Sequence, residues 1–286
     1  MGELIVGCSG WNYPDPPPDG WLGVFYPRKD IRMLKYYSRF FNTAEMDATF
    51  YEKFYSQMAR ETFLGLVKAT PDNFQFSVKV PETITHKKRL DMTKGVTHDL
   101  TEFLYKISPL KFSNKLATIL IQLPPSFTVK EFRKTEKFLD ALPKGYDYAL
   151  EFRHESWKTE GPWEMLKHYN IAAVITDCPD EELQYLAEPA VTADHAFIRW
   201  HGRNNGFWYD YLYSKEELKP WVEKVTAIRE QTRITRGYFN NHLGGKAVLN
   251  ALQFRSMTGK ITEEERRTMR EVEDYLAGKA GMQKWM

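Results

Sequence analysis

Cysteines and long apolar runs are both scarce in this sequence. Only Cys8 and Cys178 occur among its 286 residues, which fits neither a disulfide framework nor a zinc-ligand spacing. No apolar run approaches membrane-spanning length. The N-terminal stretch lacks the features of a secretory signal, and Val6 stands where a myristoylation pattern needs Ser or Thr. These absences predict a cytoplasmic protein with two reduced thiols and no membrane segment.

A strong charge of either sign is also missing. Lys and Arg number 40 against 38 Asp and Glu, for a formal net charge of +2. A protein that coats nucleic acid would need a large basic excess, so any contact with a polyanion must be local. The 42% hydrophobic and 15% aromatic residues are enough for a large core and for rings in a ligand pocket.

Strand-like runs alternate with amphipathic segments from end to end. The strands are predicted at 4–8, 43–49, 74–80, 116–123, 147–152, 171–176, 196–201 and 236–240. The helices are predicted at 33–41, 56–69, 96–112, 130–142, 163–169, 216–231 and 246–255, with at most a short helix after the sixth strand. Eight βα units without a Gly-rich first turn or a linker predict an α/β protein that forms a single (β/α)₈ TIM barrel over residues 1–286.

Two segments fall outside this alternation. Residues 12–27, after the first strand, are rich in Pro and aromatics and predict a structured loop over the barrel mouth. Residues 262–286 predict a peripheral C-terminal helix that begins with a capping box from Thr262 to Glu265. Similar boxes join Thr128 to Glu131 and Ser214 to Glu217.

Polar residues follow nearly every predicted strand. In a (β/α)₈ barrel the chemistry lies at the C-terminal ends of the strands, so these residues are the candidates for a site. Cations outnumber carboxylates among them, and Arg and Lys bind phosphate or carboxylate groups. The sequence therefore predicts an anion-binding mouth. Its substrate-binding residues are predicted to be Trp11, Asp47, Lys79, Gln122, Arg153, Arg199, Arg203, Asn240 and Asn241.

Carboxylates and histidines in the same positions suggest general acid–base chemistry. Glu151 or Asp177 is a candidate general base, and His201 or His86 a candidate general acid. The leading hypothesis is a hydrolase that acts on a phosphorylated or nucleic-acid-derived substrate such as a phosphodiester, with the cations stabilising developing negative charge. Glu151 and Arg153 share one strand face, and a purely structural ion pair between them is the alternative.

The order of short motifs resembles one protein family. They are GCSGW at 7–11, FYP at 25–27, FNTAEMDATFY at 41–51, FSVKVP at 76–81, ITHKKRL at 84–90, QLPPSF at 122–127, EFRHESW at 151–157, HGR at 201–203 and YFNNH at 238–242. Together they resemble the domain of unknown function 72 family, the YecE-like proteins. The resemblance implies a barrel fold and no particular reaction. The chain departs from the family pattern in its longer, Pro-rich first loop and at Glu45-Met46-Asp47, where the family has EIN.

Several other functions stay open on this sequence. A divalent metal is possible, with oxygen and nitrogen ligands from Glu45, Glu151, Asp177, His201 and His242, although nearby cations would repel it. A non-catalytic binder of nucleotides or single-stranded nucleic acid could stack bases on Trp11, Trp21, Tyr51, Trp157 and Trp208. A glycosidase could use Glu45 or Asp47 with Glu151. The oligomeric state stays open.

Overall fold

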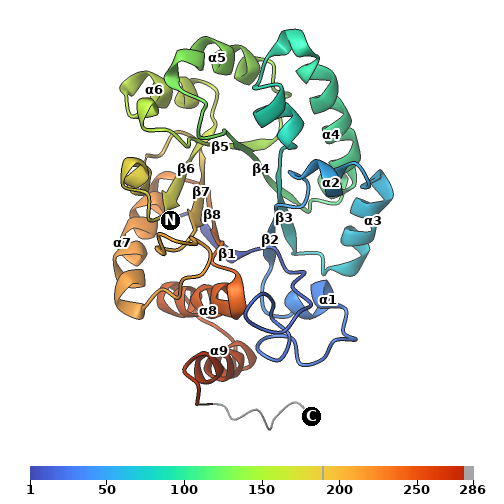
Figure 1. The fold of residues 1–286 in the computed structure, drawn as a ribbon, viewed down its shortest axis with the longest axis vertical. Helices are drawn as coiled ribbons and strands as arrows, with labels where there is room; N and C mark the ends of the chain where they lie inside the picture. The colour runs from blue at the N-terminus through green and yellow to red at the C-terminus, as the bar shows by residue number, and fades with distance from the viewer. Residues whose placement is uncertain (189, 280–286) are drawn as a thin grey trace.

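The computed structural model describes residues 1–188 and 190–279. Across these residues eight parallel strands close into a barrel in sequence order, and the last strand pairs with the first (Figure 1). The strands are β1 Glu3–Ser9, β2 Thr43–Met46, β3 Gln75–Lys79, β4 Leu116–Gln122, β5 Asp147–Glu151, β6 Ala172–Asp177, β7 His195–Trp200 and β8 Ile234–Phe239. The predicted (β/α)₈ fold is confirmed.

Helices surround the barrel and cover the outer faces of the strands (Figure 1). They are α1 Met33–Tyr37, α2 Glu52–Tyr55, α3 Arg60–Ala69, α4 Val96–Phe112, α5 Phe132–Asp140, α6 Glu160–His168, α7 Lys215–Gln231, α8 Lys246–Thr258 and α9 Glu263–Leu276. Between β6 and β7 the described residues form a short 3₁₀ helix, Glu181–Ala187, as expected. The helix predicted at 56–69 corresponds to α3, which begins only at Arg60, and the short helix α2 that precedes it was not predicted.

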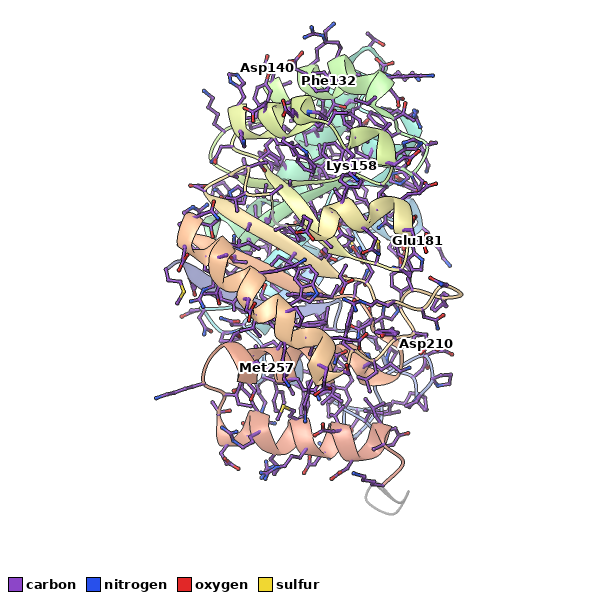
Figure 2. All side chains as sticks on the ribbon, turned by 90° about the vertical axis from the view of Figure 1, so that its left-hand side faces the viewer. Phe132, Asp140, Lys158, Glu181, Asp210 and Met257 are labelled. Atoms are coloured by element: carbon purple, nitrogen blue, oxygen red, sulfur yellow. The ribbon has the colours of Figure 1, made fainter. Side chains whose placement is uncertain are left out.

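All three predicted capping boxes are present. Ser214 caps α7 and Thr262 caps α9, while Thr128 caps a short 3₁₀ turn, Val129–Glu131, that leads into α5. Each box satisfies backbone N–H groups that the first turn leaves free. Figure 2 shows α9 as an outermost layer beside α8. The predicted peripheral helix is thus found at α9, and residues 280–286 of that prediction lie outside the described residues.

The two ends of the barrel are distinguished by which loops they carry. In Figure 2 the labelled Glu181 and Asp210, from the loops after β6 and β7, lie on the right, and Asp140 and Met257, at the ends of α5 and α8, lie on the left. The strands therefore point their C-terminal ends towards the right of that view. This C-terminal face is where a barrel of this class places its chemistry.

The interior of the barrel is filled rather than hollow. At mid-height the strands contribute a layer of Leu120, Ala149, Ala172, Val174, Phe197 and Tyr238, all buried. Because side chains alternate along a strand, residues two positions beyond this layer also face the interior. They include Gln122, Glu151, Arg199 and Asn240. This apolar layer thus lies directly below the polar residues of the C-terminal face.

The first loop covers part of that face. Trp21 is fully buried and its Nε1 donates a hydrogen bond to the carbonyl oxygen of His242 at 2.6 Å. Tyr13 stacks on the His242 ring with centroids 4.9 Å apart, and Tyr26 donates a hydrogen bond to the carbonyl oxygen of Trp11. The predicted structured loop is confirmed, and it is joined to the end of β8.

Cys8 and Cys178 are both free and buried, as predicted. Burial raises the pKa of the Cys178 thiol to about 11 and that of Cys8 further still. Both thiols are therefore protonated at neutral pH, and they act as small apolar groups in the core. Separately, no helix among the described residues combines the length and apolar character needed to cross a lipid bilayer.

Candidate active site

Arg199 lies at the centre of a buried ion cluster at the C-terminal face. Its Nη1 donates to Glu151 Oε2 at 2.7 Å and its Nη2 donates to Glu45 Oε1 at 2.6 Å. All three side chains are at most 1% exposed. A buried charge is tolerable only when it is paired and hydrogen-bonded. One guanidinium therefore bridges carboxylates from β2 and β5 and ties those strands to β7.

Glu151 is the most heavily hydrogen-bonded carboxylate of the cluster. Besides Arg199 it accepts from Arg153 Nη1 at 3.0 Å, Gln122 Nε2 at 3.0 Å and His201 Nε2 at 3.3 Å. Burial alone would raise its pKa, but the charges of Arg199 and Arg153 hold that pKa well below its ordinary value. Its side chain is 0% exposed and its oxygens accept from four donors, so it cannot reach a proton on a ligand. Glu151 therefore suits a role in positioning its neighbours better than the general-base role that the sequence suggests.

His201 is held on both ring nitrogens. Because Nε2 faces an ionised carboxylate, it must carry the proton, and Nδ1 then accepts from Asn240 Nδ2 at 2.9 Å. Burial and the nearby Arg199 charge lower the pKa of His201 to about 4. It is neutral at pH 7 and 1% exposed, so it has no free proton to deliver to a ligand.

Glu45 and Asp47 share a single hydroxyl. Ser9 Oγ lies 2.5 Å from Glu45 Oε1 and 3.0 Å from Asp47 Oδ2, and its one proton can serve only one of them at a time. Among the described residues, Glu45 Oε2 has no hydrogen-bond partner. Burial and the charge of Asp47 raise the pKa of Glu45 to about 7 against the opposing charge of Arg199.

Asp47 is shifted the opposite way. Burial would raise its pKa, but the charges of Lys79 and Arg199 lower it below the ordinary value. Asp47 is therefore ionised at pH 7, whereas Glu45 is close to half protonated. Carboxylates whose pKa values are pushed apart in this way are typical of sites that handle protons. Of the two, Asp47 reaches the cavity above the cluster.

That cavity has a volume of about 790 Å³. Its lining combines the aromatic residues Trp11, Tyr13, Phe50, Tyr51, Phe54 and Tyr209 with polar residues that include Asp47, Lys79, His86, Gln122, Arg153, Arg199, Asn240 and His242. This combination of apolar wall and converging polar groups is typical of a pocket for a small molecule. Glu45 and Glu151, each 0% exposed, lie beneath it.

His86 comes from a π-helical segment, Thr83–Lys87, that follows β3. Its ring packs edge-on against Phe50 with centroids 4.8 Å apart, and its Nδ1 lies 2.9 Å from Thr85 Oγ1. Burial lowers its pKa to about 4, helped by the positive charges of Lys79 and Arg153. His86 is therefore neutral at pH 7. It can accept a proton, whereas the sequence suggested that it donates one.

Asp177 and Arg203 do not reach the cavity, contrary to the prediction. Arg203 Nη2 donates to Asp177 Oδ2 at 2.9 Å, and Trp221 of α7 donates to the same oxygen at 3.2 Å. The interior residues of β6 are Ala172 and Val174, so the alternation turns Asp177 towards the helices. After His201, Gly202 has a φ of +98° and turns Arg203 away from the interior.

Asn241 also points away from the cavity. Its Nδ2 donates to the carbonyl oxygen of Tyr211 and to Asn250 Oδ1, each at 2.8 Å, so it joins the loop after β7 to α8. Among the rings proposed for stacking, Trp21 and Trp157 are fully buried in the core. Trp208 lies under the Arg153 guanidinium at 5.0 Å. Trp11 and Tyr51 are the two of that group that line the cavity.

Several cavity residues were missed at the sequence level. Phe50 belongs to a recognised motif but reads as an ordinary core residue, and Tyr209 lies in a loop without periodicity. Tyr13 lies in the first loop, where only a general covering role is predicted. The proposed metal ligands do not gather: within residues 1–188 and 190–279, no three His, Cys, Asp or Glu side chains are arranged to hold a metal ion.

Comparison with known proteins identifies the family. The model of the family described as protein of unknown function DUF72 matches residues 5–272. The chain belongs to this family. The UPF0759 protein YunF of Bacillus subtilis is 28% identical over 277 residues, which cover 87% of this chain and 93% of the relative. The UPF0759 protein YecE of Escherichia coli K12 is 24% identical over 250 residues, covering 80% and 83%.

Solved structures of DUF72 proteins show the same fold. One from Thermotoga maritima superposes with a TM-score of 0.72 at 32% identity, covering 89% of this chain and 98% of the other. One from Enterococcus faecalis has a TM-score of 0.71 at 23% identity, covering 91% and 97%. The resemblance predicted from the motifs is thus confirmed. None of these names specifies a substrate or a reaction.

Proposed function

We propose that this DUF72 protein is an enzyme that binds a phosphorylated substrate in the 790 Å³ cavity and hydrolyses a phosphate ester. The observation that carries the proposal is the environment of His86. Beyond the effect of burial, the positive charges of Lys79, Arg153 and Arg89 all lower its pKa against the single opposing charge of Glu82. The charges that act most strongly on His86 are thus mostly positive, which favours an anion near this residue.

Arg153 is the side chain best suited to hold a phosphate. It lines the cavity at 14% exposure, is engaged on one side by Glu151, and lies over Trp208. A planar guanidinium anchored on one edge can offer its remaining N–H groups to phosphate oxygens. Gln122 and Asn240 add neutral polar groups to the lining of the cavity.

The charge balance is closer than the sequence suggests. Lys79, Arg153 and Arg199 are matched in number by Glu45, Asp47 and Glu151, so the expected excess of cations is absent when all six are ionised. An excess of one positive charge appears when Glu45 holds a proton, which its pKa of about 7 makes common at neutral pH. Binding of a phosphate dianion should in turn favour that protonated state.

The hydrolysis step needs a proton acceptor for the attacking water. Asp47 is ionised and lines the cavity, and neutral His86 lies on the same wall. Either can take that proton, while Arg153 and Lys79 stabilise the charge that develops on the phosphoryl oxygens. Removing one such charged contact typically costs about two to three orders of magnitude in rate.

The test combines binding with turnover. Calorimetric titration with inorganic phosphate should give saturable binding that Arg153→Ala weakens. A panel of chromogenic phosphomonoesters and phosphodiesters should show hydrolysis that Asp47→Asn or His86→Gln reduces about a hundredfold. If phosphate does not bind at a single pH across the whole range from 6 to 8, the proposal is refuted.

The aromatic wall favours a second candidate, a non-catalytic nucleotide binder. Trp11, Tyr51 and Tyr209 could stack on a base while Arg153 holds its phosphate. Nucleotide affinity that exceeds phosphate affinity, without turnover of any ester, would support this candidate. A glycosidase is disfavoured, because Glu45 and Glu151 both accept from Arg199 beneath the cavity floor.

A further inference from the structure

Lys79 differs from an ordinary buried lysine. It ends β3, its side chain is 7% exposed, and it lines the cavity. Its Nζ lies 3.9 Å from the centroid of the Phe50 ring. Its ion-pair partner among the described residues is Asp47, whose Oδ1 is 4.0 Å away and accepts no hydrogen bond. The amine is thus held against an aromatic ring with its nearest carboxylate beyond hydrogen-bonding distance.

Lys115 shows how the same protein satisfies a buried lysine that has a structural role. It is 3% exposed, and its Nζ donates to the carbonyl oxygens of Val67 and Thr70, each at 2.8 Å, and to Thr70 Oγ1 at 3.2 Å. These three acceptors use all three ammonium protons. Lys79 is buried at a comparable level, yet its Nζ faces the cavity.

Such surroundings favour the neutral amine over the ammonium. Burial lowers the pKa of Lys79, as does the charge of Arg199, although Asp47 opposes them. The ammonium still provides positive charge to the cavity, but a larger fraction of the group is a free amine than for an exposed lysine. Desolvation beside another cation is a recognised way to activate a lysine as a nucleophile.

We propose that Lys79 is a covalent nucleophile for the carbonyl carbon of an aldehyde or ketone whose phosphate group is held by Arg153. The inference rests on the proposed function for the phosphate contact, and it narrows the substrate class to phosphorylated carbonyl compounds. The cavity supplies the amine, a base at 4.0 Å in Asp47 and an apolar wall at Phe50 that limits access of water.

The step balances without any further reactant. Rotation of the Lys79 side chain first closes the 4.0 Å gap to Asp47, which takes one proton from the ammonium. The nitrogen lone pair then forms a bond to the carbonyl carbon while the C=O π pair moves to oxygen. That oxygen takes one proton from nitrogen and the proton returned by Asp47, and it leaves as water as the C=N bond forms. The ammonium and the carbonyl thus give an iminium ion and one water. The iminium keeps the positive charge that faces the phosphate.

The experiment traps this iminium in the full-length protein. The protein is incubated at neutral pH with glycolaldehyde phosphate and cyanoborohydride, which delivers hydride to the iminium carbon, and the modified peptides are located by mass spectrometry. Lys87 is the matched comparison: it lies in the segment after β3, is 55% exposed and pairs with Glu82 at 3.0 Å. We expect Lys79 to be modified at least about tenfold faster than Lys87. Excess inorganic phosphate should slow the reaction with glycolaldehyde phosphate. Glycolaldehyde itself, which lacks the phosphate group, should also react more slowly.

Lys79→Arg separates this inference from the proposed function. It keeps the positive charge but cannot form an imine, so phosphate affinity measured by calorimetry should persist while the fast modification disappears. If Lys87, the more exposed lysine, is modified faster than Lys79, the inference is overturned. If phosphate still binds to the unmodified protein in that case, the proposed function stands alone. If phosphate does not bind, the proposed function fails, whatever the labelling pattern.

Discussion

The barrel interior carries an ion-paired cluster at each end, and the two clusters differ in what surrounds them. At the N-terminal end Asp147 accepts from Arg236 at 3.1 Å and also pairs with Arg233, while Arg236 donates to Gln75 Oε1 at 3.1 Å. The Asp147 carboxylate on β5 thus pairs with two guanidiniums, and Arg236 links β8 to both β5 and β3. At the C-terminal end three carboxylates and three cations crowd beneath a cavity of about 790 Å³.

Crowding at the C-terminal end changes proton affinities. The pKa of Glu45 is raised, those of Asp47 and Glu151 are lowered, and so are those of Lys79 and His86. In barrels of this class the C-terminal face carries chemistry and the N-terminal face stability. The comparison therefore predicts that changes at the N-terminal cluster alter stability alone. Changes at the C-terminal cluster should alter ligand binding and pH dependence as well.

The largest effect is expected for Arg199→Met. Glu45 and Glu151 would lose their shared counter-charge while fully buried, and the free energy of unfolding should fall by about 3–5 kcal/mol. Urea unfolding measures this. Adding Glu45→Gln and Glu151→Gln to the same protein should recover part of the loss. If it recovers nothing, the loss comes from packing rather than from stranded charge.

Arg236→Met should cost about 2–3 kcal/mol of unfolding free energy, because Asp147 keeps Arg233 and some solvent contact. Phosphate affinity, measured by calorimetry on the same sample, should not change. A weakened affinity would contradict the division of roles between the two ends of the barrel.

Arg153→Ala tests the C-terminal cluster, where a change should affect ligand binding more than stability. The free energy of phosphate binding should become less favourable by about 1.5–3 kcal/mol, which is roughly a ten- to hundredfold loss of affinity. Stability should fall by only about 1 kcal/mol, since Glu151 keeps Arg199, Gln122 and His201. Calorimetry and thermal unfolding separate the two quantities.

Arg133→Ala, which removes an exposed pair with Glu136, is the control and should change stability by less than about 0.5 kcal/mol. Unchanged affinity with a collapsed midpoint would leave Arg153 as part of the scaffold.

The smallest predicted effect concerns the pH dependence of stability. The pKa of Glu45 is about 7 in the folded protein against an ordinary value of 4.5, so the folded state binds more protons between these values. Its contribution to stability is therefore present at low pH and is lost as pH rises, by about 1 kcal/mol between pH 6 and 8. Glu45→Gln should lack this loss, and unfolding curves for both proteins across that range give the difference. Parallel pH profiles would mean that Glu45 is ionised throughout.

The sequence predicted the fold more fully than the site. Strand β2 is shorter than predicted, because Thr49 turns back to hydrogen-bond the carbonyl oxygens of Met46 and Lys79. Asp177 was misplaced because β6 is buried at every position and offers no alternation to count. Their positions at the C-terminal ends of the predicted strands placed Lys79, Gln122, Arg153, Arg199 and Asn240 on one face correctly. Those positions could not reveal that Arg199 pairs with three carboxylates, Glu45, Asp47 and Glu151, since that depends on distances across the closed barrel.

The hydrogen bond from Trp21 to His242 joins residues 221 positions apart, and this has a consequence for how the molecule is made. A ribosome adds roughly 5–20 residues per second, so the first loop waits about ten to forty seconds for its partner at the end of β8. Until then Trp21 and Tyr13 have no His242 to pack against. The contact between the first loop and the end of β8 therefore forms late, and a nascent chain that stops before β8 cannot close the barrel.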